Sequence, residues 1–362
     1  MLKRLVLATQ GSPYNLHHTV ISLSDLGPVG AQLRDAGVAV EALGMRSALQ
    51  VPSAILGLRD RFLVMKPDVV QTWMPHGNLL GGLAARLAGI PRVIWGIRSS
   101  VIMANTSHLT RLAIWLCARL SSLIPAVIVC AAEAARRTHE GIGYDATRMV
   151  VIPNGFDMPV SEDHAEVDAF RALLGWSGSE LVVGTVGRFH PHKDYNNFVE
   201  AAVLVAQREP RARFLMIGSG LDEHNTVLVS WIVRAGLGSR FTLLGVRGDI
   251  PKCMAAMDLF VLPSLTEGFP NVVGEAMAVG VPCAVTDVGD SALLVGDTGE
   301  ITPPKNAAAL AAAICRLLAM QASDRRSLGG RARLRIDSEF SMERVCERFA
   351  AIYERVSNPR VT

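Results

Sequence analysis

The sequence has little of several features that mark particular classes of protein. Its six cysteines lie far apart and form no C-x-x-C pair, which excludes a zinc site of paired cysteines and indicates reduced thiols in a reducing compartment. The sequence also contains no D-x-D pair that would indicate a metal site. The net charge of the 362 residues is only +3, too small to indicate a nucleic-acid binder.

Long hydrophobic runs are also missing, although half of the residues are hydrophobic and the mean hydropathy is +0.29. The longest apolar stretch, residues 112–132, is interrupted by Arg119, Ser121, Ser122 and Pro125. A spanning helix needs about 20 nearly uninterrupted apolar residues, and the apolar run at the N-terminus is too short for a signal peptide. We therefore expect a cytoplasmic protein.

Short apolar, β-branched runs alternate with helical patterns along the whole chain. The predicted strands are residues 18–23, 69–73, 92–95 and 126–130 in the first half, and 181–187, 214–217, 241–244, 259–262 and 282–286 in the second. The predicted helices include residues 79–88, 109–120, 197–207 and 272–279. Wholly apolar strands separated by helices indicate parallel sheets covered on both faces. The fold class is therefore α/β, with two Rossmann-like domains that face each other across a cleft.

The turn-rich residues 153–159 separate two halves of opposite charge. Residues 1–150 hold 15 basic and eight acidic residues, a net charge of +7, and the remainder has a net charge of −4. This asymmetry is either ordinary surface variation or a sign that the first half faces phospholipid headgroups or a lipid diphosphate. We predict domains at residues 1–157 and 158–338, followed by a helix at 339–362. That helix carries an apolar stripe, which consists of Val345, Phe349, Ile352, Tyr353 and Val356.

A glycine and two cations follow the predicted strand at residues 181–187. Gly187 would let the backbone approach a ligand closely, and Arg188 and Lys193 would supply hydrogen-bond donors for a diphosphate. The alternative is an exposed basic loop.

A second motif, at residues 263–278, follows the predicted strand at 259–262. Glu267 lies in a loop, a helix begins near Asn271, and Glu275 lies within that helix. Amides at a helix start form an anion site, and two separated carboxylates can accept hydrogen bonds from the hydroxyls of one polyol. A solvated pair of glutamates fits less well, because Glu275 lies in an otherwise apolar helix.

These motifs resemble those of the retaining nucleotide-sugar glycosyltransferases of family 4, which have the two-lobed GT-B fold. Glu267 and Glu275 have the spacing of the family's E-x7-E signature. The other matching stretches are residues 187–194, 218–220, 244–251, 258–264, 286–289, 295–299 and 303–304, and residues 152–157 extend the match to the linker.

The resemblance implies a role for each matching residue. Arg188 and Lys193 would hold the donor diphosphate, Glu267 the transferred sugar, and Glu275 the ribose. The further donor-binding positions are Gly187, the amides around Gly268, Phe269, Asn271 and Val272, and Arg247 near the base. The resemblance also implies a co-substrate that is a nucleotide sugar, UDP-linked in our prediction, with no cofactor or metal. Retention would come from attack by the acceptor on the face shielded by diphosphate.

The first half departs from the family in two ways. The opening strand and its glycine-rich turn are missing, because residues 2, 5 and 6 suit the helix that follows them, so we expect the native start about 20 residues upstream, the length of a strand and its turn. Arg98 also occupies the place where many relatives have a histidine. Arg98 cannot act as a base, but it can bind a phosphate, unless it is a surface ion-pair residue. His76 is a second acceptor-side candidate.

Three functions compete. The first is transfer of a sugar to a glycan or lipid-linked acceptor in polysaccharide synthesis, at the inner surface of the membrane. The second is a nucleotide-sugar epimerase, which would need no acceptor and would therefore react with the donor alone. The third is a non-catalytic or impaired nucleotide-sugar-binding protein, for which a thermal shift with UDP but no turnover is the discriminating result.

Overall fold

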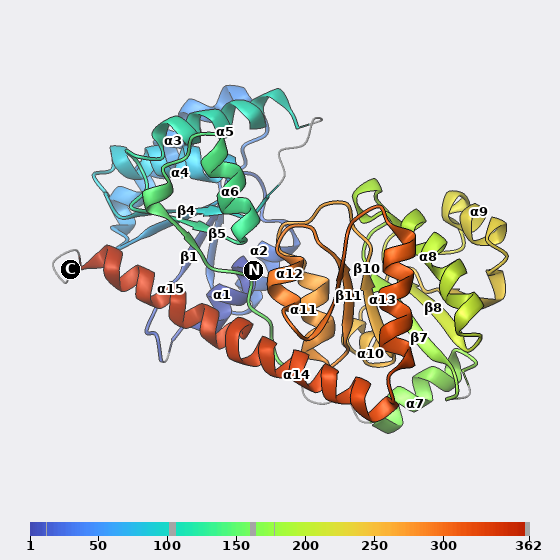
Figure 1. Cartoon of the computed structure of the whole chain (residues 1–362). Helices are drawn as coiled ribbons and strands as arrows, with labels where there is room; N and C mark the ends of the chain where they lie inside the picture. Colours follow the sequence, from blue (N-terminus) through green and yellow to red (C-terminus); the bar gives the residue numbers. More distant parts are fainter. Residues whose placement is uncertain (12, 101–105, 160–163, 177, 359–362) are drawn as a thin grey trace. The chain divides into compact units, whose positions relative to one another are not determined.

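A computed structural model describes residues 1–11, 13–100, 106–159, 164–176 and 178–358, and they form two compact units (Figure 1). The first unit contains Met1–Gly155 and Met342–Thr362, and the second contains Phe156–Ser341. Each unit is built on parallel strands with intervening helices. The prediction of an α/β chain with two Rossmann-like domains is confirmed; the predicted cleft between them stays a prediction.

The second unit has one six-stranded parallel sheet. Its strands in spatial order are β12 (Gly299–Thr302), β11 (Cys283–Thr286), β10 (Leu259–Leu262), β7 (Leu181–Val186), β8 (Ala212–Ile217) and β9 (Phe241–Leu243). Every residue of β7, β10 and β11 is buried. Their almost wholly apolar sequences therefore reflect burial on both faces of the sheet.

Helices cover both faces of this sheet (Figure 1). They are α7 (His164–Leu173), α8 (Tyr195–Arg208), α9 (Thr226–Arg234), α10 (Ile250–Ala255), α11 (Asn271–Ala278), α12 (Ser291–Val295), α13 (Ala307–Ala319) and α14 (Ala322–Phe340). Helices α8 and α13 pack together over the face that carries Ala284 of β11. Helix α11 packs against α14 and contacts Cys283, which lies on the other face.

The strand order of the second unit reverses between β7 and β10. From β7 the chain proceeds outward through β8 and β9, and from β10 it proceeds in the opposite direction through β11 and β12. The loops that follow two such neighbouring strands diverge and leave a crevice at the carboxyl edge of the sheet, where ligands of open α/β sheets bind. The two motifs singled out in the sequence are those two loops.

The first unit has two separate parallel sheets. One contains β1 (Thr19–Ser22) and β2 (Ala39–Ala42), and the other contains β3 (Val70–Trp73), β4 (Val93–Ile97), β5 (Val127–Cys130) and β6 (Met149–Val151). In the part of the chain that the structure describes, no ladder joins β1 to β3. The helices are α1 (Leu2–Thr9), α2 (Gly27–Asp35), α3 (Val51–Met65), α4 (Met74–Leu87), α5 (His108–Leu120), α6 (Glu133–Gly141) and α15 (Met342–Ser357).

Helices α1 and α15 complete the core of the first unit. Leu5 of α1 packs with Ile94 and with the stripe of α15, whereas Val6 packs with Val40 of β2. The stripe predicted for the last helix is therefore buried on the first unit, with Tyr353 half-buried at its edge. The helix predicted at the N-terminus is confirmed as α1.

All six cysteines are free, and five are buried. Burial raises the pKa of Cys117 and of Cys130 to about 12, so these thiols stay protonated at neutral pH. Among the described residues, no single helix is long and apolar enough to cross a bilayer; α13 and α14 meet the length and hydropathy criteria only when taken together, and they are bent by 112°.

Candidate active site

The loops after β7 and β10 bring two predicted site residues into direct contact. Nζ of Lys193 lies 2.7 Å from Oε1 of Glu267, and the two side chains are 20% and 14% exposed. The residues are 74 positions apart in the sequence. They meet because β7 and β10 are neighbours in the sheet. The ion pair therefore lies at the strand-order reversal.

Ser264 holds the carboxylate of Glu267 through a hydrogen bond. Its Oγ donates a hydrogen bond of 2.7 Å to Oε1 of Glu267, and its carbonyl accepts one from Oγ1 of Thr286. The side chain of Ser264 is fully buried. Sequence reasoning missed this role; the available signal was a small polar residue between a buried strand and Glu267. A buried donor of this kind holds the carboxylate in one orientation.

Two glycines allow backbone segments to approach closely in the loops that carry this pair. A Cβ on Gly218, whose φ is +136°, would lie 1.9 Å from the carbonyl oxygen of Gly187. A Cβ on Gly289, whose φ is +59°, would lie 2.5 Å from the carbonyl oxygens of Glu267 and Gly268. Substitution at either position would push the Gly187 turn or the Glu267 loop out of place.

The loop between Gly187 and Lys193 carries further positive charge. Arg188 is exposed, and among the described residues no hydrogen bond or ion pair engages its guanidinium. Partial burial, reinforced by the charges of His192, Arg188 and Lys193, lowers the pKa of His190. Burial, reinforced by the carboxylate of Glu267, raises the pKa of Tyr195, so its phenol stays protonated. The loop is therefore cationic, and its charge is complementary to that of an anionic ligand.

Helix α11 begins immediately after the Glu267 loop and carries Glu275, which is half-buried. The amides of its first turn, at Asn271 and Val272, have no acceptor within the helix. The side chain of Phe269 packs on the rings of Phe156 and Phe340, with ring centroids 6.0 Å apart in each case. Phe269 is therefore a core residue that offers a ligand only its backbone, as does Gly268.

Arg247 has a partner of its own. Its guanidinium forms two hydrogen bonds with the carboxylate of Asp249, at 2.8 and 2.6 Å, and lies 5.5 Å from the ring centroid of Phe170. It follows β9, two strands from β7 in the sheet. The structure therefore does not bring Arg247 into contact with Lys193 or Glu267, and its predicted contact with a base stays a prediction.

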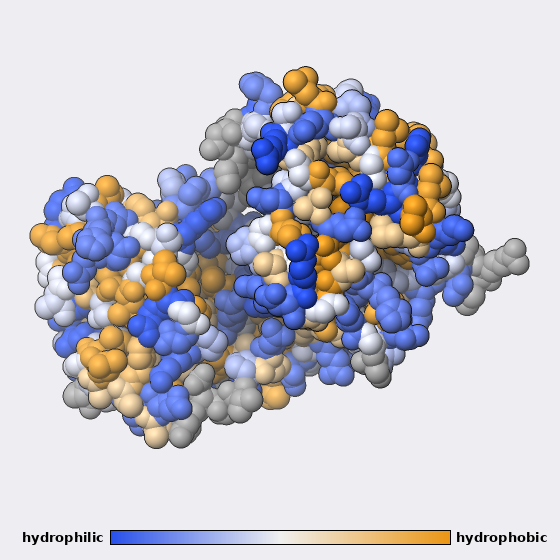
Figure 2. Space-filling view, turned by 180° about the vertical axis from the view of Figure 1, so that it is seen from behind, coloured by the Kyte–Doolittle hydropathy of each residue, from blue (hydrophilic) through white to orange (hydrophobic). Residues whose placement is uncertain are grey.

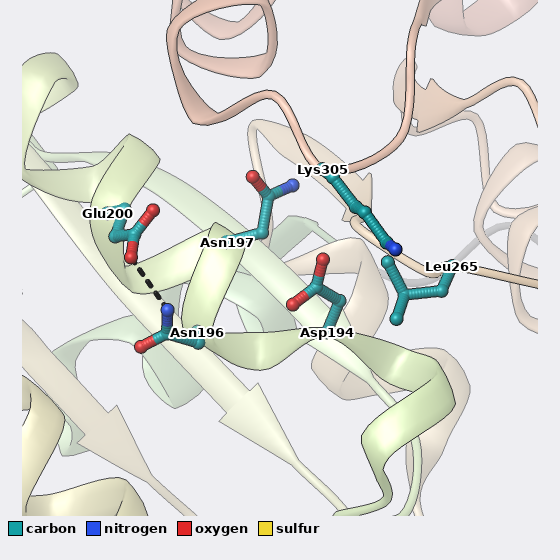
Figure 3. A pocket seen from close by; sticks show the side chains of 6 residues that line it. All are labelled: Asp194, Asn196, Asn197, Glu200, Leu265 and Lys305. Atoms are coloured by element: carbon teal, nitrogen blue, oxygen red, sulfur yellow. Dashed lines mark hydrogen bonds between the residues drawn. The ribbon is translucent and has the colours of Figure 1, made fainter.

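A pocket of about 250 Å³ lies at the start of α8, next in sequence to Lys193. It is lined by Asp194, Asn196, Asn197, Glu200, Leu265 and Lys305 (Figure 3). Asn196 donates a hydrogen bond to Glu200, and the amino group of Lys305 points toward Asp194 and Leu265 in the same view. The lining carries both signs of charge, so the pocket does not select an anion, and none of the predicted site residues lines it.

The two acceptor-side candidates lie in the first unit and differ in their surroundings. Arg98 follows β4, and its guanidinium lies 4.6 Å from the ring centroid of Trp73. Its Nη1 and Nη2 are buried and have no hydrogen-bond partner among the residues that the structure describes. Burial lowers the pKa of Arg98 to about 10. The alternative of a surface ion-pair residue is therefore wrong. His76 is exposed in the first turn of α4.

Two models of known protein families match the chain, one in each half. Residues 180–320 match a family model described as glycosyl transferases group 1, and residues 14–158 match one described as glycosyltransferase family 4. Together the two matches cover most of the chain. The chain belongs to glycosyltransferase family 4. The resemblance predicted from its motifs is thus confirmed.

Two of the curated relatives of this family 4 chain are named as sugar transferases. Over 237 residues it is 31% identical to an Escherichia coli UDP-Gal:alpha-D-GlcNAc-diphosphoundecaprenol alpha-1,3-galactosyltransferase, a match that covers 64% of this chain and 60% of the relative. Over 210 residues it is 30% identical to the lipopolysaccharide core biosynthesis mannosyltransferase LpsB of Rhizobium meliloti, with coverages of 56% and 60%. The matches span less than two thirds of these relatives' lengths.

Solved structures extend the comparison over the whole chain. Anabaena Alr3699/HepE in complex with UDP aligns with a TM-score of 0.83 at 22% identity, covering 98% of this chain and 95% of the other. The apo form of the lipopolysaccharide outer core galactosyltransferase WaaB aligns with a TM-score of 0.72 at 12% identity, with coverages of 97% and 93%. These likenesses confirm the predicted GT-B fold.

Proposed function

We propose that this family 4 chain is a retaining glycosyltransferase that moves a sugar from a UDP-sugar to a glycan or lipid-linked acceptor in polysaccharide synthesis. The observation that carries the proposal is the contact between Lys193 and Glu267 at the strand-order reversal; Arg188 lies in the same loop as Lys193. The names of the relatives support it, since one is a UDP-Gal transferase with a diphosphoundecaprenol acceptor. Two of the similar solved structures are complexes of Anabaena Alr3699/HepE, one with UDP and one with UDP-glucose.

In the proposed reaction the cations stabilise the leaving group. The bond between the anomeric carbon and the diphosphate oxygen breaks, and its electron pair stays with the diphosphate. We propose that Lys193, Arg188 and backbone amides at the start of α11 bind this developing charge, which would be preorganised electrostatic catalysis. We propose that they do so without a metal ion or cofactor.

Binding of the donor changes the partners of Lys193. In the structure its ammonium is paired with Glu267. We propose that it turns part of its hydrogen bonding to the diphosphate, while Glu267, held by Ser264, accepts hydrogen bonds from the sugar hydroxyls. Glu275 would bind the ribose. The acceptor oxygen then forms the new bond on the face that the diphosphate shields, and its proton leaves with the diphosphate.

The acceptor side is assigned to the first unit. A buried, unpaired guanidinium is costly unless an anion compensates it. Among the described residues Arg98 is such a group, and we propose that it binds a phosphate of the acceptor. His76, in the first turn of α4, is the second acceptor-side residue of the proposal. Free cysteines are typical of reducing compartments, and we place the reaction at the cytoplasmic face of the inner membrane.

The test is transfer from a panel of UDP- and GDP-sugars to the cell's lipid fraction, with products identified by mass spectrometry. We expect a glycosylated lipid from a UDP-sugar, and no sugar isomer when the donor is incubated alone. Glu267→Gln should abolish transfer. Glu166→Gln is a matched control, because Glu166 also pairs with a lysine, Lys252, but on the surface of the same unit. Isomerisation of the donor without acceptor would contradict the proposal.

A further inference from the structure

Apolar surface does not single out a further binding site on this protein. Exposed hydrophobic side chains lie in groups among hydrophilic ones on both units in the face shown in Figure 2, which is normal for folded proteins. The pocket at the start of α8 is different, because loops from three strands of one sheet contribute to it. Asp194 follows β7, Leu265 follows β10, and Lys305 follows β12. The pocket is therefore built by the strand order of the second unit.

The pocket is joined to the candidate active site through the same two loops. Asp194 directly follows Lys193, and Leu265 comes two residues before Glu267. The amide of Leu265 donates a hydrogen bond of 2.8 Å to the carbonyl of His192, which links the loops. None of the lining residues has a role in the proposed transfer. The pocket is therefore a second candidate site, next to the first.

Asn197 places an unsatisfied amide in the wall of this pocket. The residue is 4% exposed, and its Nδ2 has no hydrogen-bond partner among the residues that the structure describes. In Figure 3 this amide, the carboxylate of Asp194 and the side chain of Lys305 lie around the same space. A buried amide without a partner is unfavourable. A ligand in the pocket that accepts a hydrogen bond from Asn197 removes that cost.

Two other residues of the lining have left-handed backbone conformations. The φ angle is +46° at Asp194 and +57° at Lys305. This conformation is unfavourable for residues with a Cβ, more so for lysine than for aspartate, and strained backbone of this kind is common where a fold holds side chains around a ligand. Burial also raises the pKa of Asp194. A hydrogen-bond donor that enters the pocket therefore stabilises the charged carboxylate.

The chemistry of the lining matches a neutral ligand better than an ion. The carboxylates of Asp194 and Glu200 disfavour an anion, and the ammonium of Lys305 disfavours a cation. Among the described residues, no group of three histidine, cysteine, aspartate or glutamate side chains could hold a metal ion. Carboxylates accept hydrogen bonds, an ammonium donates them and amides do both, which suits the hydroxyls of a sugar. The volume of about 250 Å³ is below the roughly 300–1,000 Å³ of pockets for drug-sized ligands, so the ligand is small.

We propose that this pocket binds one neutral sugar residue, beside the donor site and independently of it. Hydroxyls of the sugar donate hydrogen bonds to Asp194 and accept them from Asn197 and Lys305. The side chain of Leu265 packs against the carbon–hydrogen bonds of the ring. The proposal goes beyond the proposed function, and it involves none of the residues assigned to transfer. Sugar binding is therefore measurable whether or not the protein transfers a sugar.

The experiment is saturation-transfer NMR on the full chain, with UDP in excess to occupy the donor site. The probes are the methyl α-glycosides of glucose, galactose, mannose and N-acetylglucosamine, together with the 6-phosphate of each sugar. We expect at least one methyl glycoside to bind with a Kd on the order of 1 mM. The corresponding 6-phosphate should bind at least about threefold more weakly, because the two carboxylates of the lining repel it.

Two variants test the lining residues. Lys305→Asn removes the ammonium and keeps a residue that tolerates the left-handed conformation. Asn197→Leu replaces the unsatisfied amide with an apolar side chain. Each should weaken binding of the methyl glycoside about three- to tenfold, because one hydrogen bond is lost. Asn197→Leu should melt no lower than the wild type, since it removes a buried amide that has no partner.

The matched control is Lys252→Asn, because Lys252 pairs with Glu166 outside the pocket, and this variant should bind the glycoside as the wild type does. If Asn197→Leu does not fold, Lys305→Asn, at an exposed residue, decides alone. The proposal is overturned if no methyl glycoside binds, if a 6-phosphate binds more tightly, if UDP displaces the glycoside, or if the folded pocket variants bind as the wild type does. Failure of the proposed donor site has a different result, because UDP would then not bind while the glycoside still does.

Discussion

Each unit contains an arginine with a buried guanidinium, and the two arginines differ in their hydrogen-bond partners. In the second unit, Arg325 donates to Oδ1 of Asp258 at 3.1 Å and to the carbonyls of Leu318 and Met320. In the first unit, both terminal nitrogens of Arg98 are buried, and no described residue hydrogen-bonds to them. The buried arginine of the second unit thus has partners within the chain, whereas that of the first unit has no hydrogen-bond partner among the described residues. An uncompensated buried cation is typical of a place that an anionic ligand completes.

The largest expected effect concerns the ion pair of Lys193 and Glu267, to which the loops after β7 and β10 each contribute one residue. Lys193→Met should lower the rate of transfer by roughly 10²–10³-fold, because a fixed donor to the leaving group is lost. Steady-state rates with saturating acceptor measure it. Lys252→Met removes a lysine from the exposed ion pair with Glu166 and should leave the rate unchanged. Equal rates for Lys193→Met and the wild type would contradict the site.

The two buried arginines should respond oppositely to removal of their charge. Arg325→Met leaves the carboxylate of Asp258 with fewer partners and should lower the free energy of unfolding by about 3 kcal/mol. Arg98→Met removes an unpaired charge and should be neutral or stabilising. Chemical denaturation of both variants measures the difference. A large loss for Arg98→Met would show that its guanidinium has a partner within the chain.

The close approach of the loops in the second unit should make one glycine irreplaceable. Gly218→Ala places a Cβ against the carbonyl of Gly187 at a positive φ, so we expect a loss of about 2–3 kcal/mol of stability. Gly330, in the interior of α14, has nothing within 4 Å of such a Cβ, and Gly330→Ala should stabilise by up to about 1 kcal/mol. Thermal unfolding compares the two. An unchanged melting temperature for Gly218→Ala would indicate a wider turn.

The smallest expected effect is a dependence of donor binding on pH. Partial burial, reinforced by neighbouring cations, lowers the pKa of His190 in the free protein. A bound diphosphate compensates those charges and raises this pKa, so binding takes up a proton, and affinity increases as pH falls below the usual histidine pKa of about 6.5. Calorimetry with UDP should show a several-fold change, which His190→Asn removes. A slope that persists in this variant would assign the proton to another group.

Most strands of the fold could be predicted because their sequences are continuous apolar runs. The strands at 69–73, 126–130, 181–187 and 259–262 all appear within one residue of their predicted ends. Strands β2, β6 and β12 were not predicted, because each has only three or four residues and most of these are exposed or half-buried. Helix α4 begins at Met74, five residues before the predicted start. Pro75 in its first turn is compatible with a helix there.

The candidate site was predictable in its residue types and not in its pairings. Glycine, cations and carboxylates after apolar strands indicated Lys193 and Glu267 as functional. Their direct contact depends on β7 and β10 being neighbours, which is a long-range property of the sheet order. The hydrogen bond from Ser264 to Glu267, and the absence of a partner for the guanidinium of Arg98 among the described residues, likewise depend on which side chains the tertiary structure buries together. No local pattern encodes these.

The central claim is that the second unit binds a nucleoside diphosphate through Lys193, and calorimetric titration with UDP tests it most directly. The account predicts that wild type and Lys252→Met bind UDP with the same affinity and that Lys193→Met binds it at least about tenfold more weakly, since one charged hydrogen bond is lost. Equal affinity of all three proteins, or no binding of UDP to the wild type, would contradict it.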